Sequence, residues 1–244
     1  MKAKKYSKKI IAVVPARGGS KGVLRKNIKI LNGKPLIYYI LKTLSKVKRL
    51  DKIVLSTEDD EIYRIASSFN IDIDVVKRPL YLSKDSTPLT SVVQYESRKL
   101  FKKGYNHDFV LQISPASPLT SIDTINNILD LLISKKTDCA VTLKRIEHDH
   151  PYRAKILDQN NFFSHFIKNI NVEKFISRQD LPLLYSTSGA IYGRTYELLQ
   201  TFSGKDFCLG KKPAGVVVND IEAINIDRQI DFEFASFILR KKKK

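Results

Sequence analysis

A glycine-rich loop that follows the first apolar run of the chain carries the residues best suited to chemistry. Gly18, Gly19 and Gly22 allow positive φ values and a close approach of the backbone, so their N–H groups can converge on phosphate oxygens. Arg17 adds a planar fork of donors, and Lys21 adds a compact charge on a flexible stem. These residues predict a phosphate-binding site.

The spacing of these glycines excludes two common classes of nucleotide-binding protein. No glycine-lysine-serine or glycine-lysine-threonine triplet follows five residues after Gly18, as it would in a P-loop ATPase. The loop also lacks the glycine-x-glycine turn of a dinucleotide-binding dehydrogenase. Taken alone, the loop leaves a second interpretation open, in which the glycines only turn the chain and the cations are solvated.

Length and composition predict one substantial cytoplasmic domain, covering all 244 residues. The apolar stretches are of strand length, and no apolar signal-peptide core follows the basic N-terminus, so neither a membrane span nor export is expected. Cys139 and Cys208 lack the spacing of a metal or redox pair. We therefore expect two unpaired thiols in a reducing compartment.

The formal net charge of +18 raises the alternative of a basic nucleic-acid-binding protein. The lysines are spread along the chain, and only the two ends hold concentrated runs, which are usually solvated tails. The charge is better explained as general surface composition that attracts anionic small molecules. We expect no nucleic-acid partner; salt-sensitive retention on polyanions would favour the alternative.

Segments with helical spacing of apolar residues alternate along the chain with short apolar runs of strand length. After the opening strand, strands are expected at Ile53–Leu55, Ile71–Val76, Phe109–Ile113, Cys139–Leu143, Gly215–Val218 and Ala223–Ile226. Helices are expected from Pro35, after a Ser56-Thr57 cap, at Pro88–Lys102, at Ser121–Lys136, and at the C-terminal end through Ile238. This alternation predicts an α/β fold with a Rossmann-like, mainly parallel sheet and helices on both faces.

In such a sheet, ligands bind beyond the carboxyl ends of the strands. This rule places the glycine-rich loop, residues 56–59 and residues 114–118 at one edge. Between about residues 146 and 191 the periodicity is lost and phenylalanines mix with histidines, so we expect an inserted arm. Its aromatic residues favour a dimer contact, and local packing against the sheet is an equal alternative.

Motifs spread over about residues 9–240 give the sequence a specific resemblance to a known family. They are Pro15–Gly22, Arg25–Ile28, Asn32–Ile37, Ser56-Thr57, Arg78-Pro79, Ser117–Leu119, Arg178–Pro182, Gly189–Tyr192, Ile226-Asp227 and Asp231-Phe232. The chain resembles the CMP-sialic acid synthetases, or acylneuraminate cytidylyltransferases. The resemblance implies a nucleotide-diphospho-sugar transferase-like fold. It also implies transfer of a cytidylyl group from CTP to the anomeric hydroxyl of an acidic nine-carbon sugar, with release of pyrophosphate.

The resemblance further implies which residues bind the nucleotide. Arg17 and Lys21 would hold the triphosphate and, with Asp227, would form the catalytic set. The nucleotide-binding residues would be Ala16, Arg17, Gly18, Gly19, Ser20, Lys21, Asn27, Arg78 and Ser86. Of these, the last three would approach the cytosine or the ribose. Arg78 could equally hold a loop by donating to carbonyl oxygens.

Mg²⁺ is the cofactor that the resemblance implies, because family members carry two aspartates two residues apart near the C-terminus. Here Asp227 occupies the second position and Asn225 the first, with a neutral amide oxygen where Mg²⁺ would prefer a carboxylate. Alternation along a strand would turn both side chains to the same face. Two other possibilities stay open: Asp227 caps the final helix, or Glu222 or Asp220 supplies the missing charge.

The acceptor site is the least defined part of the resemblance. Arg153, Arg178 and Tyr192 match positions that contact the sugar acid in the family. Ser114 stands at a substrate-binding position where the family usually has glutamine. Two guanidinium groups suit a carboxylate.

Departures from the family pattern widen the choice of acceptor. Ser114, Thr120 and Ser188 replace glutamine, arginine and asparagine, so sialic, legionaminic and pseudaminic acids all remain candidates. A 3-deoxy-manno-octulosonate cytidylyltransferase is an alternative, as is a weakened nucleotide-binding homologue, given Asn225. We expect a homodimer that exchanges contacts through the arm.

Overall fold

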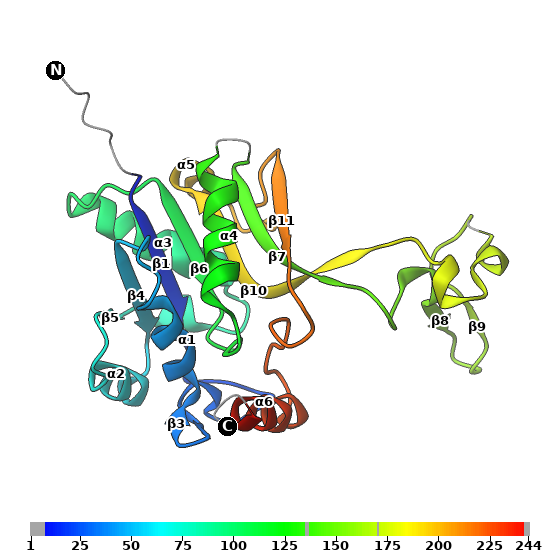
Figure 1. The fold of residues 1–244 in the computed structure, drawn as a ribbon, viewed down its shortest axis with the longest axis horizontal. Helices are drawn as coiled ribbons and strands as arrows, with labels where there is room; N and C mark the ends of the chain where they lie inside the picture. Colours follow the sequence, from blue (N-terminus) through cyan, green and yellow to red (C-terminus); the bar gives the residue numbers. More distant parts are fainter. Residues whose placement is uncertain (1–7, 135–136, 170, 242–244) are drawn as a thin grey trace.

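A seven-stranded sheet forms the centre of the molecule. The computed structural model describes residues 8–134, 137–169 and 171–241. The sheet strands are β1 (Ile10–Pro15), β4 (Lys52–Thr57), β5 (Asp74–Lys77), β6 (Phe109–Ile113), β7 (Cys139–Arg145), β10 (Tyr185–Thr195) and β11 (Pro213–Val217). They lie in the order β11-β7-β10-β6-β1-β4-β5, so the strand that opens the fold lies inside the sheet (Figure 1).

Most of the strand pairs are parallel. β1 runs parallel to both β4 and β6, β4 runs parallel to β5, and β11 runs parallel to β7. Only β10 runs against its neighbours β6 and β7. The expected mainly parallel α/β sheet is confirmed, and β1, β4 and β6 end at one common edge, the lower one in Figure 1.

Helices cover both faces of the sheet, as the alternation of elements predicts. They are α1 (Leu36–Leu44), α2 (Asp60–Ser67), α3 (Leu89–Lys102), α4 (Ile122–Ile133), α5 (Tyr196–Gln200) and α6 (Gln229–Lys241). Two short hairpin strands, β2 (Ile30–Leu31) and β3 (Lys34–Pro35), precede α1. Within the described ranges, no helix combines the length and apolarity needed to cross a bilayer.

The side chains of β1 show why this strand is apolar throughout. Ala12 and Val14 pack in the core formed with α1, α2 and α4, whereas Ile11 and Val13 pack on the opposite face with α3 and α5. Successive strand residues point to opposite faces, so a strand covered on both sides must be continuously apolar. The rigid, buried strand therefore fixes the start of the glycine-rich loop that follows it.

Two expected elements differ from the structure near the C-terminal half. Residues 223–226, expected as a strand, form a turn and extended coil instead. Residues 185–195, expected mostly within the arm, form the long strand β10, and Ile191 pairs with Ile113 in the sheet. Gly189, with φ of +77°, lies in a register shift of this strand that interrupts its alternation.

The residue that caps α2 differs from the one expected from the sequence. Ser56 and Thr57 are buried at the end of β4 and do not cap the helix. Asp59 is the cap, because its carboxylate accepts hydrogen bonds from the backbone N–H groups of Glu61 and Ile62. The sequence Ser-Thr-Glu-Asp thus ends a strand before it begins a helix.

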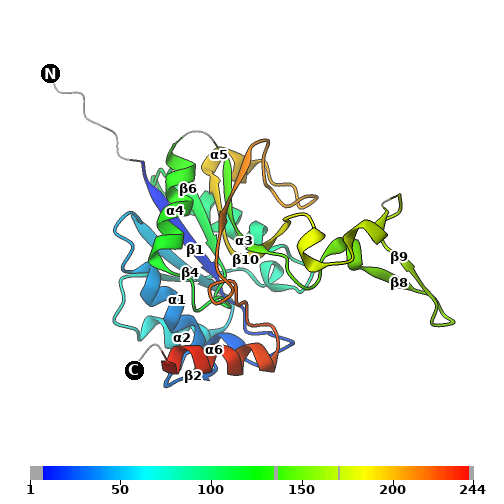
Figure 2. The same ribbon diagram turned by 45° about the vertical axis from the view of Figure 1, so that its right-hand side comes forward.

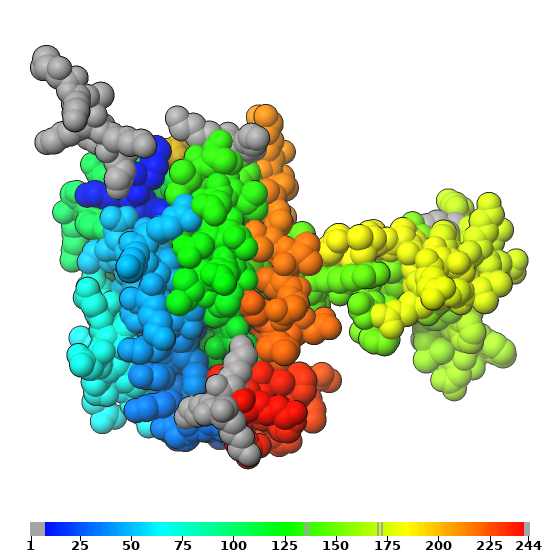
Figure 3. Space-filling view, viewed as in Figure 1, coloured from blue at the N-terminus to red at the C-terminus, as the bar shows by residue number. Residues whose placement is uncertain are grey.

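Residues 146–184 form an arm that stands away from the sheet, as Figures 1 to 3 show. The outer parts of β7 and β10 carry it, with Arg145 opposite Tyr185 and the Ile146 N–H bonded to the Leu184 carbonyl. The arm contains the hairpin β8 (Lys155–Leu157) and β9 (Phe163–His165). Its exposed apolar side chains are Ile156, Leu157, Phe162, Phe163, Phe166, Ile176 and Leu183. The arm has the exposed aromatics expected from the sequence; whether it belongs to one folding domain stays a prediction.

Candidate functional site

A pocket of about 460 Å³ lies at the carboxyl edge of the sheet, beyond the ends of β1 and β6. It is lined by four segments that are distant in sequence: the glycine-rich loop with the residues that follow it, residues 85–89 at the start of α3, residues 114–116 after β6, and the coil before α6. The lining includes these residues predicted from the sequence: Arg17, Ser20, Lys21, Asn27, Ser114, Asn225 and Asp227. It also includes Gly22, Lys26, Asp85, Thr87 and Leu89.

A second hollow of about 350 Å³ lies at the opposite edge of the sheet. Two of its three carboxylates are already engaged: Asp108 pairs with Lys8, and Asp138 accepts hydrogen bonds from the backbone N–H groups of Lys211 and Lys212. The residues of the sequence motifs line the first pocket, which is therefore the candidate functional site.

Gly18 and Gly22 are required for close approach, and none of the three loop glycines has the positive φ expected from the sequence. All three are described, and none has φ in the left-handed region. A Cβ at Gly18 would meet the Asp59 carboxylate at 2.3 Å, and one at Gly22 would meet the backbone oxygen of Asp227 at 1.9 Å. Gly22 therefore allows the loop to touch the coil before α6.

Part of the loop backbone is committed to internal hydrogen bonds. Ala16 is buried and donates its N–H to the Ser56 carbonyl, so it does not line the pocket. The Gly18 N–H donates to Glu58 Oε1 at 2.8 Å. The Ser20 N–H donates to the Gly18 carbonyl at 3.1 Å. The expected convergence of loop N–H groups on phosphate therefore does not extend to these three residues.

The two loop cations meet one carboxylate in the pocket. Arg17 Nη1 and Lys21 Nζ each lie 2.6 Å from an oxygen of Asp85. The Lys21 hydrogen bond is the main reason that the pKa of Asp85 lies below its usual range. The cations are thus held side by side at the mouth of the pocket, at a spacing that one bridging anion can satisfy.

Lys26 is a pocket residue that the sequence reasoning missed. Its ammonium group donates to the Ile226 carbonyl and lies 3.0 Å from Asp227 Oδ1, and its side chain is only 15% exposed. A third, largely buried cation therefore faces the same space as the loop cations. The Arg25–Asn27 run was the available signal, and within it only Asn27 was given a role.

Asn27 joins the loop to the pocket floor. Its amide nitrogen donates to the Arg17 carbonyl at 2.9 Å, whereas its amide oxygen is buried without a hydrogen-bond partner among the described residues. A buried unpaired acceptor is costly. Since Asn27 lines the pocket, a donor on a bound ligand would satisfy this oxygen.

Arg78 and Ser86 do not line the pocket. Arg78 is buried, and it donates to Ser83 Oγ at 3.0 Å, to the Ser56 carbonyl at 3.1 Å and to Glu58 at 2.6 Å. Burial lowers the pKa of Arg78, and the Glu58 carboxylate opposes that effect. These contacts match the loop-holding alternative for Arg78, because Glu58 connects it to Gly18. Ser86 is exposed beside Asp85.

Asn225 and Asp227 both reach the pocket, although they lie in coil and not in the expected strand. The Asn225 Oδ1 atom is buried without a partner among the described residues, and the Asp227 carboxylate contacts Lys26 instead of capping α6. Such a pair of oxygens fits one Mg²⁺ ion that takes its other ligands from phosphate and water. No group of three or more histidine, cysteine or acidic residues in the described ranges could hold a metal by itself.

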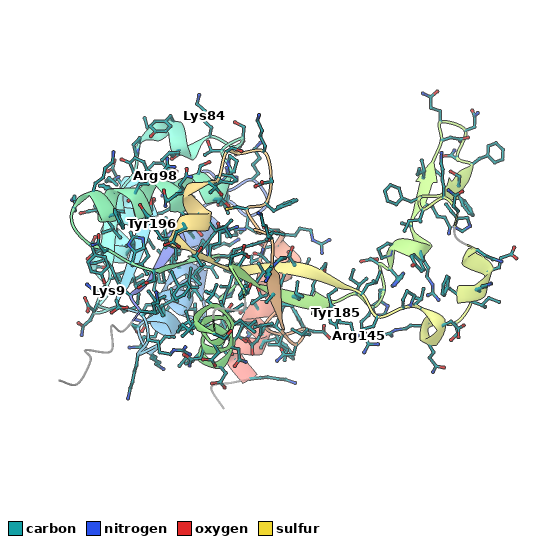
Figure 4. All side chains as sticks on the ribbon, turned by 90° about the horizontal axis from the view of Figure 1, so that it is seen from above. Lys9, Lys84, Arg98, Arg145, Tyr185 and Tyr196 are labelled. Atoms are coloured by element: carbon teal, nitrogen blue, oxygen red, sulfur yellow. The ribbon has the colours of Figure 1, made fainter. Side chains whose placement is uncertain are left out.

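The predicted acceptor residues are divided between two regions. Ser114 lines the pocket, and Tyr192 lies in β10 with its ring 5.2 Å from the guanidinium of Arg194. Arg153 and Arg178 lie on the arm, where Arg153 donates to the Ile176 carbonyl and Arg178 pairs with Glu147. Figure 4 shows how far the arm extends beyond its base at Arg145 and Tyr185. The two arm arginines are therefore not brought to the pocket of their own chain.

An ion-pair cluster of Arg25, Asp59 and Glu61 lies beside the glycine-rich loop. Arg25 contacts Asp59 through both carboxylate oxygens and also contacts Glu61, and Asp59 lies against Gly18. The Arg25 hydrogen bond is the main reason that the pKa of Asp59 falls to about 2. The folded state therefore binds protons at Asp59 less readily than the unfolded chain does.

Replacing Asp59 with asparagine is expected to lower the free energy of unfolding at neutral pH. The free energy of unfolding of the variant should also change less as the solution is made acidic. Asparagine keeps the helix cap but loses the ion pair. Because the folded pKa is depressed, the stabilisation is present above about pH 4 and is lost as pH falls toward about 2. Urea unfolding of both proteins should show a difference in unfolding free energy that narrows as pH falls from about 4 to about 2; a constant difference would contradict the prediction.

Known proteins match this sequence over nearly its whole length. The cytidylyltransferase family matches residues 11–234. A pseudaminic acid cytidylyltransferase of Campylobacter jejuni is 29% identical over 233 residues, covering 95% of this chain and 97% of the relative. A CMP-N,N'-diacetyllegionaminic acid synthase of the same species is 28% identical, with 96% of each chain covered. An N-acylneuraminate cytidylyltransferase of Streptococcus agalactiae is 33% identical over 75% of this chain and 43% of its own length.

Solved structures show the same fold. A CMP:2-keto-3-deoxy-manno-octonic acid synthetase complexed with CTP has a TM-score of 0.71 at 16% identity, covering 96% of this chain and 99% of that one. The 4-diphosphocytidyl-2C-methyl-D-erythritol synthase of Anaerococcus prevotii has a TM-score of 0.64 at 18% identity. At these identities the likeness concerns the fold alone. The sequence match over residues 11–234, together with the pocket geometry, shows that the chain belongs to the cytidylyltransferase family.

Proposed function

We propose that this protein transfers a cytidylyl group from CTP to a nonulosonic acid, giving the CMP-sugar and pyrophosphate. The convergence of three cations, Arg17, Lys21 and Lys26, on one pocket at the end of β1 carries the proposal. A triphosphate and an acidic sugar bring like charges together, and the departing pyrophosphate gains charge, so cations must stabilise the transition state. The two buried free thiols, Cys139 and Cys208, suit a cytoplasmic enzyme.

In the proposed reaction the anomeric hydroxyl attacks the α-phosphorus of CTP. The hydroxyl loses its proton to solvent water as the new O–P bond forms, and the bond between the α-phosphorus and the oxygen that bridges to the β-phosphate breaks, with its electron pair leaving on pyrophosphate. Arg17 and Lys21 bind the β- and γ-phosphates and stabilise the charge of the leaving group. Asn27, through its unpaired amide oxygen, accepts a hydrogen bond from the nucleoside.

The nine-carbon acid is proposed to be pseudaminic, legionaminic or sialic acid, as in the names of the relatives. A panel assay tests this: CTP, Mg²⁺ and each acid, with 3-deoxy-manno-octulosonate included, followed by pyrophosphate release and CMP-sugar detection. We expect turnover with one of the nine-carbon acids. Turnover only with 3-deoxy-manno-octulosonate would favour that alternative, and CTP binding without turnover would favour a weakened homologue.

Mg²⁺ is proposed as the cofactor, held by Asp227 and Asn225 together with the phosphates. When bound, the ion would neutralise phosphate charge and polarise the attacked phosphorus centre. The support is the chemistry of the pair: one exposed carboxylate and one buried, unpaired amide oxygen in the same pocket. Lys26 would give up its contact with Asp227 and turn to phosphate.

Replacing Asn225 with aspartate is expected to lower the Mg²⁺ concentration needed for half-maximal activity, because a carboxylate binds Mg²⁺ better than a neutral amide does. The measurement is a Mg²⁺ titration of pyrophosphate release, with direct Mg²⁺ binding by calorimetry in the presence of CTP. Asn219→Asp, the same substitution on the same coil but outside the pocket lining, serves as the control. Identical titrations for wild type and Asn225→Asp would argue against metal at this position.

We further propose that the arm completes the acceptor site of a second copy in a homodimer. The resemblance assigns Arg153 and Arg178 to the sugar acid, yet both lie on the arm, away from the pocket of their own chain. The exposed apolar surface of the arm suits burial in such a contact. Mixing Arg17→Ala and Arg178→Ala chains should then restore activity, to about a quarter of wild type, since half of the dimers hold one intact site. No recovery on mixing would count against exchange of arms.

A further inference from the structure

Among the residues that the structure describes, Asp85 and Asp227 are the two acidic residues of the pocket lining, and Asp85 contacts the cations that should bind phosphate. One carboxylate oxygen lies 2.6 Å from Arg17 Nη1, and the other lies 2.6 Å from Lys21 Nζ. This two-point contact is what two oxygens of a phosphate group would make with the same cations. Asp85 and a triphosphate therefore cannot both hold the pair in this geometry.

The position of Asp85 allows it to be displaced without disturbing the core. It lies between the short 3₁₀ helix Leu80–Ser83 and α3, on a turn closed by the hydrogen bond from the Thr87 N–H to the Lys84 carbonyl. The Asp85 side chain is about half exposed. In Figure 4 the preceding residue, Lys84, points outward from the body of the molecule. Rotation of one side chain on this outer turn would release both cations.

We propose that Asp85 is an internal counter-anion of the phosphate loop. It occupies Arg17 and Lys21 when no phosphate is bound, yields them to the triphosphate of CTP, and competes for them again once pyrophosphate has formed. The inference rests on the proposed cytidylyl transfer. Asp85 thereby weakens the hold on pyrophosphate and speeds its release.

The charges at the site make this exchange feasible. Without an anion, two cations on one short loop would repel each other and spread the loop, so Asp85 keeps them in place. Each of its pairs is solvent-exposed and therefore weak, and a triphosphate with several charges displaces it. Lys21 holds the pKa of Asp85 below its ordinary value, so the carboxylate is charged at the pH at which the nucleotide binds.

The test is calorimetric titration of inorganic pyrophosphate and of CTP into wild type, Asp85→Asn and Asp130→Asn at fixed salt. Asp130 is a matched control: it is an exposed partner of Arg49 on α4, outside the pocket, and its replacement changes net charge equally. Asp85→Asn should bind pyrophosphate about five- to tenfold more tightly, because two screened pairs no longer compete. Asp85→Glu should remain near wild type, and Asp130→Asn should not differ from it.

Pyrophosphate inhibition of turnover should strengthen by the same factor in Asp85→Asn. Pyrophosphate binding that is unchanged or weaker in Asp85→Asn would overturn the counter-anion role while leaving the proposed function intact, since wild type would still bind CTP. Wild type that binds neither CTP nor pyrophosphate would instead remove the phosphate site, and with it both proposals. An equal increase in pyrophosphate affinity in Asp85→Asn and Asp130→Asn would show that the effect comes from net charge. That result would also overturn the inference.

Discussion

Replacing Arg17 with alanine is expected to lower turnover about a hundredfold or more, with little change in thermal stability. Arg17 lines the pocket at the end of β1, and its guanidinium faces the space assigned to the leaving phosphates. The transition state gains charge on those oxygens, so the loss should fall on turnover more than on CTP binding. Steady-state release of pyrophosphate at saturating CTP measures it. Lys21→Ala should act in the same direction, and normal turnover in both variants would remove the triphosphate assignment.

Arg49 provides a matched control for this experiment. Its side chain is 34% exposed and pairs with Asp130 at 2.7 Å, whereas that of Arg17 is 33% exposed and pairs with Asp85 at 2.6 Å. The two arginines thus have equal exposure and equivalent partners, and only one lines the pocket. Arg49→Ala should retain full turnover. An equal loss in both variants would show that the effect is a general one of removing a surface cation.

Replacing Gly22 with alanine is expected to destabilise the protein by about 1–3 kcal/mol and to abolish most activity. The added Cβ would lie 1.9 Å from the backbone oxygen of Asp227, and backbone cannot move aside as a flexible side chain can. The loop and the coil before α6 would have to separate, which would pull Lys21 and Asp227 apart. Urea unfolding and pyrophosphate release measure the two effects.

Gly19→Ala is the control for the glycine experiment. In the described part of the chain, no atom lies within 4 Å of the position that its Cβ would take, and its φ is not in the left-handed region. The variant should be as stable and as active as wild type, because the added Cβ would meet no neighbouring atom. The control is matched, since both glycines belong to one loop and differ in the atoms beside them. Equal tolerance of Gly22→Ala would refute the close approach.

The alternation of apolar runs was sufficient to predict the sheet and its helices, because β1, α1, α3, α4 and β6 are each positioned by local periodicity. The same alternation predicted which loops share an edge. It failed at β10, where polar residues and the positive φ of Gly189 break the pattern, and at residues 223–226, which form a turn and coil leading to the contact of Asp227 with Gly22. Those contacts are tertiary and leave no periodic signal.

The residues of the candidate site also divide into those that local sequence predicts and those that only tertiary contacts bring together. Arg17, Lys21 and Asn27 could be found because they follow a strand in one short segment. Asp85 and Glu58 could not, since they lie 68 and 40 positions from their partners Arg17 and Gly18 and reach them only after the chain has folded. Reasoning from residue type alone therefore finds the cations of a site more readily than the groups that hold them.

The bond between Lys26 and Asp227 spans 201 positions of the chain. During synthesis Asp227 can reach Lys26 only after every strand of the sheet, β11 included, has been made, so the pocket cannot be complete before the sheet is. A nucleotide that contacts both segments should therefore also hold the coil before α6 against the loop and stabilise the folded state.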